Sequence, residues 1–231
     1  MFDAAPVAFV FEFAYTDGEG TAPSQVGRLP RPRLPSCAQT RLSHCETANC
    51  LRDKMKKILV IGCPGSGKST FARGLNSITG IPLYYLDMLW HQPDGTNLAR
   101  EAFDAALVEI LAEDRWIVDG NYPRTLPMRL AKCDTVFLFD IPVAECLTGA
   151  EKRIGMPRAD MPWVEETFSD EFRRYIQDFP TEQFPGIYRA LHECPQIDKV
   201  IFRSRTEADA YLHALPRAEC ADNGKNLICI P

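Results

Sequence analysis

The chain has 231 residues, enough for one sizeable α/β domain with roughly 50 residues to spare. A formal net charge of −5 disfavours a large non-specific grip on DNA, so direct nucleic-acid binding by the domain is not expected. No apolar run is long enough to span a bilayer, so we expect no membrane partner. Nine cysteines at irregular spacing, without a C-x-x-C pair, favour a reduced protein in the cytoplasm.

Residues 1–54 differ in composition from the rest of the chain. Prolines and arginines stand among serines and threonines, and few large apolar residues follow Tyr15. Such a stretch buries too little apolar surface to offset the entropy of ordering it, so we expect a disordered extension. Met55 precedes the first apolar run, which makes it a candidate native initiator and the upstream sequence a candidate mis-called start. The alternative is a basic arm over 28–41 that binds nucleic acid or a partner.

The stretch that organises the chain is 57–70, KILVIGCPGSGKST. Its apolar run at 58–61 is typical of a buried parallel strand. The next residues fit G-x-x-x-x-G-K-[ST], the phosphate-binding loop, and a helix over 69–78 that stops at Gly80 should follow. Successive N–H groups of such a loop point at one anion, beside the positive end of a helix. The predicted ATP-binding residues of the loop are Gly62, Cys63, Pro64, Gly65, Ser66, Gly67, Lys68, Ser69 and Thr70.

Apolar runs and helical periodicity alternate along the remainder of the chain. Further strands are predicted at 82–87, 116–119, 135–139 and 199–202. Helices are predicted at 101–112, 143–154, 163–179 and 204–212, the last opened by a capping box at Ser204 and Glu207. This rhythm predicts a doubly wound five-stranded parallel sheet with the P-loop architecture of nucleoside monophosphate kinases over 55–215. A frayed tail is expected at 216–231.

Phosphoryl transfer requires positive charge around the transferred group and a carboxylate on the metal side. Lys68 is expected to reach the β- and γ-phosphate oxygens, and the Ser69 hydroxyl to bind Mg²⁺. Asp119 and Asp140 both end apolar strands. Asp119 is favoured as the metal-side carboxylate because Gly120 leaves room beside a nucleotide, whereas Asp140 is interpreted as a strand-end turn residue.

Basic and acidic residues outside the loop supply candidates for the lid and for the catalytic base. Asp87 is placed to orient or deprotonate an acceptor hydroxyl, with a helix N-cap as its alternative role. Arg153 and Arg158, with Gly155 and Pro157 between them, read as a short hinged lid that completes the catalytic set, with a solvated basic turn as the alternative.

Acceptor binding is assigned to two arginines that follow the third strand. Arg124 and Arg129 flank the segment after Asp119 and are placed to bind a phosphate on the acceptor.

The segment 116–122, WIVDGNY, continuing through Thr125 to Arg129, resembles the W-I-x-D-G-N-Y-x-x-T-L-x-x-R segment of a family of small P-loop proteins. These are known as DNA topology modulation proteins or adenylate-kinase-like kinases. The dipeptides at 146–147, 152–153 and 160–161 and the motif at 204–207 match as well, so the resemblance covers about 56–215. It implies ATP as co-substrate, Mg²⁺ as cofactor, and a place for Arg205 in the ATP site.

A wider resemblance is to adenylate kinases. The segment 119–124 is similar to their D-G-F-P-R motif with one extra residue, and 87–90 is similar to D-M-L-R. Trp90 stands where adenylate kinases place an arginine on the AMP phosphate. There it would stack on a base or cover an uncharged substrate, with core packing as the alternative.

Together these features predict a cytoplasmic kinase that transfers the γ-phosphoryl group of MgATP to a small nucleotide-like or hydroxyl acceptor. The alternative is a nucleotide-binding regulator that influences DNA topology with little or no transferase activity. The partners expected are ATP and the small-molecule acceptor, and the sequence leaves open whether the chain is a monomer or a homodimer.

Overall fold

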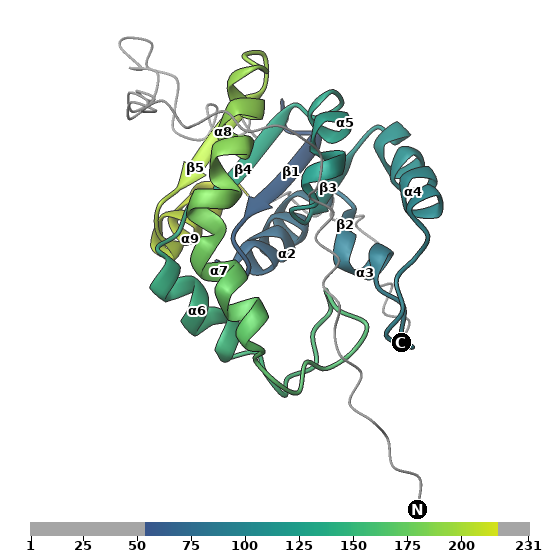
Figure 1. Cartoon of the computed structure of the whole chain (residues 1–231). Helices are drawn as coiled ribbons and strands as arrows, with labels where there is room; N and C mark the ends of the chain where they lie inside the picture. Colours follow the sequence, from purple (N-terminus) through teal and green to yellow (C-terminus); the bar gives the residue numbers. More distant parts are fainter. Residues whose placement is uncertain (1–53, 217–231) are drawn as a thin grey trace, which may run out of the picture. The chain divides into compact units, whose positions relative to one another are not determined.

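A parallel sheet of five strands carries the phosphate loop. The computed structural model describes residues 54–216, and its strands lie in the order β2-β3-β1-β4-β5 with every pair parallel (Figure 1). Their bounds are β1 (Lys57–Gly62), β2 (Leu83–Tyr85), β3 (Trp116–Asp119), β4 (Thr135–Phe139) and β5 (Asp198–Phe202). β1, β3 and β4 are buried at almost every residue, which explains their continuous apolar sequences. The predicted doubly wound five-stranded sheet is confirmed.

Helices cover both faces of this sheet. α2 and α9 pack together on one face, while α5, α7 and α8 cover the other (Figure 1). The helices are α2 (Lys68–Thr79), α3 (Leu86–Trp90), α4 (Arg100–Ala112), the 3-10 turn η1 (Pro123–Thr125), α5 (Leu126–Leu130), α6 (Val143–Glu151), α7 (Asp170–Glu182), α8 (Phe184–His192) and α9 (Arg205–Ala214). None of the described helices is long and apolar enough to cross a membrane.

Phe71 fixes the start of α2 against the sheet. Its ring lies 4.8 Å from that of Phe137, 5.4 Å from Phe139 and 5.2 Å from Phe202, measured between centroids. Each such pair contributes about 0.5–1.5 kcal/mol beyond its buried area. Because Phe71 follows Lys68 by less than one helical turn, this aromatic cluster also holds the loop end of the helix in place.

The second strand ends earlier than predicted, and Asp87 is not at a strand end. β2 stops at Tyr85, and Asp87 lies in the first turn of α3. β2 pairs only with β3, and Tyr85 is opposite Asp119, the last residue of β3. Beyond this pair β2 has no partner strand, so the chain turns into a helix anchored by the fully buried Leu86.

The predicted helix at 163–179 begins too early. Ser169 caps α7, since its hydroxyl accepts a hydrogen bond from the Phe172 N–H at 3.1 Å, so 163–169 belong to the preceding loop. The helix predicted through residue 154 ends at Glu151. α5 and α8, each with a proline in its first turn, were not predicted.

The capping box before α9 is confirmed. The Ser204 hydroxyl accepts from the Glu207 N–H at 3.2 Å, while Glu207 Oε2 accepts from the Arg203 N–H at 2.7 Å. Apart from their boundary residues, the predicted extension at 1–54 and the predicted tail at 216–231 lie outside the described residues.

Candidate active site

The phosphate loop and Asp119 lie at the same edge of the sheet. β1 leads into α2 on one face, and its neighbour β3 leads through η1 into α5 on the other (Figure 1). In open parallel sheets a crevice forms beyond the strand ends where successive helices go to opposite faces, and ligands bind there. The crevice between β1 and β3 is therefore the candidate site.

Backbone contacts press the phosphate loop against α6. Gly65 has φ 75°, and a Cβ there would lie 2.1 Å from the carbonyl oxygen of Cys146. Gly149 faces it, since a Cβ at this position would lie 2.2 Å from the carbonyl oxygen of Gly65. Only residues without a Cβ allow this approach.

Arg205 ties the loop to α6 from the other side. Its Nη2 donates to the carbonyl oxygens of Gly65 and Glu145, each at 2.8 Å, and its Nε donates to that of Ser66 at 3.3 Å. The structure thus places Arg205 directly on the phosphate loop, with its hydrogen bonds going to backbone. A contact with ATP itself stays a prediction.

Lys68 and Ser69 lie beside the carboxylate of Asp119. Burial raises the pKa of Asp119 to about 6, while the charge of Lys68 and the hydroxyl of Ser69 act to lower it. Asp119 is 4% exposed, and its Oδ1 is buried without a hydrogen-bond partner. Lys68 Nζ donates to the carbonyl oxygen of Cys63 at 3.0 Å, across the loop. The ammonium group of Lys68, the hydroxyl of Ser69 and an unsatisfied carboxylate oxygen of Asp119 therefore lie close together.

These residues fit Mg²⁺ bound together with a nucleotide. Mg²⁺ usually keeps several waters and takes one or two carboxylates plus substrate phosphates. Asp119 and Ser69 supply a carboxylate and a hydroxyl of this kind. Within residues 54–216 no group of three or more His, Cys, Asp or Glu side chains is placed to bind a metal directly.

Asp140 is the other carboxylate at a strand end, and it is already bound by protein side chains. Its Oδ2 accepts a hydrogen bond from the Tyr188 hydroxyl at 2.5 Å and forms an ion pair with Arg203. This agrees with the interpretation of Asp140 as a structural residue at the end of β4.

Asp87 lies on the β2 side of Asp119, beside a strained tyrosine. The Tyr122 hydroxyl donates to Asp87 Oδ1 at 3.0 Å, and Tyr122 has φ 26°, in the region that residues other than glycine rarely adopt. Asp87 is close enough to Asp119 to raise its pKa. Burial and the carboxylate of Asp87 raise the pKa of Tyr122, so the phenol stays protonated as a donor.

Arg129 holds the backbone around this tyrosine. Its guanidinium is fully buried and donates to the carbonyl oxygens of Gly120, Asn121 and Tyr122 at 2.7–2.9 Å. Burial lowers its pKa to about 10. The structure does not bring Arg129 out to an acceptor; it places the side chain beneath the segment that carries Tyr122.

Arg124 and Trp90 differ in their surroundings. Arg124 forms two hydrogen bonds of 2.7 and 2.8 Å to Asp104 on α4, and its side chain is 41% exposed. Trp90 packs edge-to-face on the fully buried Phe103 at 5.4 Å and lies 6.3 Å from the ring of Tyr122. These aromatic rings form a wall next to Asp87.

The two arginines predicted to form a lid are both paired with Glu165, a residue that sequence reasoning missed. Glu165 Oε2 lies 3.2 Å from Arg153 Nε and 3.6 Å from Arg158 Nη2, and Arg158 Nη1 lies 3.8 Å from Asp160. Arg153 also lies near the loop: its charge opposes the rise in the pKa of Cys63 that a hydrogen bond with Cys146 and burial produce. No spacing or motif marks Glu165 in the sequence.

The loop between α6 and α7 carries the two arginines predicted to form a lid, and it also meets the region of the residues predicted to bind the acceptor. The ring of Trp163 in this loop lies 4.8 Å from that of His91, the residue that follows α3. Asp160 of the same loop acts with Asp87 to raise the pKa of Asp119. Residues that follow β1 and β3, residues of α3 and residues of the loop between α6 and α7 therefore lie around the same edge of the sheet.

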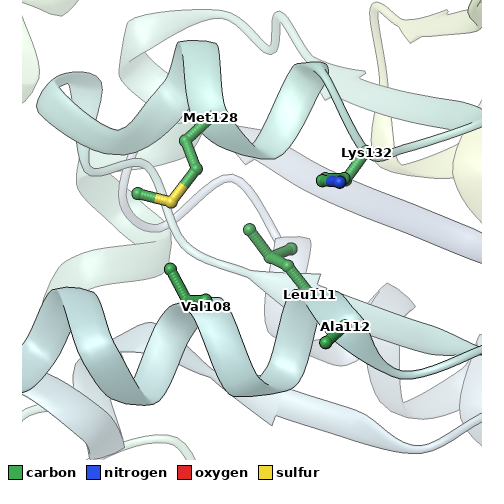
Figure 2. A pocket seen from close by; sticks show the side chains of 5 residues that line it. All are labelled: Val108, Leu111, Ala112, Met128 and Lys132. Carbon is green, nitrogen blue, oxygen red and sulfur yellow. The ribbon is translucent and has the colours of Figure 1, made fainter.

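A small apolar cavity of about 140 Å³ lies elsewhere, between α4 and α5 (Figure 2). Its lining consists of Val108, Leu111, Ala112, Met128 and Lys132. It contains none of the residues predicted to bind ATP, metal or acceptor.

The sheet order and the phosphate loop define a protein with the P-loop NTPase fold. No protein-family model matches the chain, and no curated protein matches it. Among solved structures, it is similar to a shikimate kinase from Acinetobacter baumannii in complex with shikimate, with 15% identity and a TM-score of 0.49, over 72% of this chain and 95% of that one.

Two further structures resemble it more loosely. One is a shikimate kinase from Bacteroides thetaiotaomicron, with 14% identity, a TM-score of 0.43 and coverage of 70% of this chain and 96% of that one. The other is a sugar kinase from Janibacter sp. HTCC2649, with 17% identity, a TM-score of 0.40 and coverage of 69% and 91%. At these identities and TM-scores the likeness supports no conclusion about this chain, and the residues of this chain must carry the case for its function.

Proposed function

We propose that this protein is a cytoplasmic small-molecule kinase that transfers the γ-phosphoryl group of ATP with Mg²⁺ as cofactor. The observation that carries the proposal is the unpartnered, buried Oδ1 of Asp119 beside Lys68 and Ser69, at the crevice of a P-loop fold. A buried carboxylate oxygen without a hydrogen bond is costly unless a ligand satisfies it. Kinship with the adenylate-kinase-like topology modulation proteins is part of the proposal and is supported by the segment 116–122.

Each residue of the crevice has a distinct task in this transfer. The loop N–H groups and Lys68 stabilise the negative charge that spreads over the oxygens of the transferred group. Ser69 and Asp119 hold Mg²⁺, which when bound neutralises charge on the phosphate oxygens. Asp87, held by Tyr122, accepts the proton of the acceptor hydroxyl.

Lid closure requires Arg153 and Arg158 to exchange Glu165 for phosphate oxygens. Both pairs are weakly held, with N–O distances of 3.2 and 3.6 Å. A phosphate offers more charge and more acceptor oxygens than one carboxylate, so the exchange favours the nucleotide-bound state. The arginines then close over the transferred group and exclude water.

The test is acceptor-stimulated ADP release from MgATP by the full-length protein and by Asp119→Asn. Asp114→Asn is the matched control, since Asp114 is an exposed aspartate just before β3. We expect at least a hundredfold loss in Asp119→Asn and unchanged turnover in the control. Tight MgATP binding without acceptor-stimulated turnover in the unaltered protein would instead favour the nucleotide-binding regulator.

A further inference from the structure

The acceptor side of the crevice indicates the chemistry of the substrate. It is formed by Asp87, Trp90, Phe103 and Tyr122. Building on the proposed function, we infer that the phosphoryl acceptor is an uncharged ring compound that bears a hydroxyl group and carries no phosphate. Nucleosides and neutral sugars share this chemistry.

Both arginines that stand closest in sequence to the acceptor segment are committed to protein partners. Arg129 is fully buried and turned to three backbone carbonyls, so its release would dismantle the segment that it supports. Arg124 is held by two hydrogen bonds to Asp104. Neither is available, as placed, to form the bidentate contact that recognition of a phosphate favours.

Carboxylates stand next to this side. Asp87 and Asp160 lie close enough to Asp119 for their charges to act on it, and they come from α3 and from the lid loop. Arg153 lies close enough to Asp87 and Asp160 for their charges to act on it, but Arg153 and Arg158 are both already paired with Glu165. A phosphate on the acceptor would meet this carboxylate group, whereas a neutral compound meets no such repulsion.

The wall of the acceptor side is aromatic. Phe103 is fully buried and backs two other rings: Trp90 packs edge-to-face on it at 5.4 Å, and Tyr122 stacks on it at 5.3 Å with an interplanar angle of 26°. As whole residues, Trp90 and Tyr122 are only partly buried. Aromatic faces of this kind bind flat bases and the apolar faces of sugar rings.

Phosphoryl transfer to such an acceptor accounts for every bond, electron pair and proton. The acceptor hydroxyl oxygen forms a bond to the γ-phosphorus of ATP while the bond from that phosphorus to the β–γ bridging oxygen breaks. ADP leaves with the electron pair of the broken bond, and the hydroxyl proton passes to Asp87. The products are ADP and a phosphate monoester.

The test compares matched acceptor pairs on the full-length protein with MgATP. The pairs are adenosine with AMP, cytidine with CMP, and glucose with glucose phosphate, and mass spectrometry identifies the product of each. We expect at least tenfold higher kcat/KM for the uncharged member of the preferred pair. Comparison of the nucleoside pairs with the sugar pair shows whether the preferred acceptor is a nucleoside or a sugar.

The outcomes separate this inference from the function on which it rests. Turnover that is equal or faster with the phosphate-bearing member overturns the inference and leaves the kinase proposal standing. Absence of acceptor-stimulated turnover with every member overturns both.

Three substitutions near the acceptor side sharpen the test. Asp104→Asn frees Arg124 from its carboxylate partner, and we expect it to narrow the preference for the uncharged member without reversing it, because Asp87 and the aromatic wall remain. Trp90→Arg places a guanidinium at the aromatic wall and should raise use of the monophosphate at least tenfold relative to its nucleoside, while Trp90→Phe should not. A preference reversed by Asp104→Asn, or unmoved by Trp90→Arg in a folded variant, contradicts the inference.

Discussion

The hydroxyl of Tyr122 donates a 3.0 Å hydrogen bond to the carboxylate of Asp87, and this bond joins the segment after β3 to the first turn of α3. Both residues stand just beyond strands that are neighbours in the sheet. The bond therefore fixes the orientation of Asp87 relative to Asp119. In the proposed reaction, the bond thus positions Asp87, the proton acceptor, relative to Asp119, the metal-side carboxylate.

Removal of that hydroxyl should impair turnover more than stability. We expect Tyr122→Phe to lower kcat about tenfold, because Asp87 loses the contact that orients it, with little change in the KM for ATP. Tyr188→Phe is the matched control, since its hydroxyl binds Asp140 outside the crevice. Steady-state kinetics and urea unfolding of both variants check this. Equal losses of turnover in Tyr122→Phe and Tyr188→Phe would contradict a specific role of the hydrogen bond between Tyr122 and Asp87 in turnover.

Arg129 and Arg124 should differ sharply in their effect on stability. Arg129→Met removes a buried guanidinium from three backbone carbonyls, and we expect the free energy of unfolding to fall by about 3 kcal/mol. Arg124→Met breaks a partly exposed ion pair and should cost less than about 1 kcal/mol. Urea denaturation of the two variants measures the difference. Similar costs would contradict the assignment of Arg129 to the support of the 120–122 segment.

Release of the lid arginines should tighten nucleotide binding. Glu165→Gln removes the charge that Arg153 and Arg158 share, so both become available to phosphate, and we expect MgATP to bind about fivefold more tightly. Glu166→Gln changes an exposed neighbour and serves as the control. Isothermal titration calorimetry gives both affinities. Weaker MgATP binding in Glu165→Gln would mean that the carboxylate prepares the lid instead of restraining it.

The raised pKa of Asp119 makes the metal-free protein sensitive to pH. Its carboxyl has a pKa of about 6 in the folded state against an ordinary value of 3.8, so the folded state binds the proton more tightly than the unfolded state does. The resulting stability is fully present below the ordinary value and is lost as pH rises through about 6. The shift amounts to about 3 kcal/mol.

Asp119→Asn removes this titration. Without Mg²⁺, we expect the variant to gain about 2 kcal/mol relative to the unaltered protein between pH 4 and pH 7. Urea unfolding at both pH values, in the presence of a chelator, measures the gain. A difference between the two proteins that does not change with pH would contradict the burial of an ionisable carboxyl at this position.

The sheet was predictable because a buried parallel strand reads as a continuous apolar run. β3 and β4 begin and end where their apolar runs do, and the capping pair of Ser204 and Glu207 marked the start of α9. The end of β2 was not predictable in the same way, since it depends on where its partner β3 stops. The start of α7 depended on the cap at Ser169, which the apolar periodicity of 163–179 concealed.

The candidate site was predictable where a motif or a strand end marked it. The G-x-x-x-x-G-K-[ST] motif located Lys68 and Ser69, and the sheet brings Asp119 to the same edge as expected of parallel strands. Arg124 and Arg129 look alike in sequence, and only tertiary burial separates a surface ion pair from a support of the backbone. Glu165 could not be found because its partners approach it only in the folded chain.

The most direct measurement of the central claim is acceptor-dependent ADP release from MgATP by the full-length protein and by Lys68→Ala. Lys132→Ala, which alters a lysine at the distant cavity between α4 and α5, is the control. If Lys68 stabilises the transferred group, its loss removes about 3 kcal/mol of transition-state stabilisation and at least a hundredfold of turnover, while the control retains full activity. Turnover that persists in Lys68→Ala would contradict phosphoryl transfer at this loop.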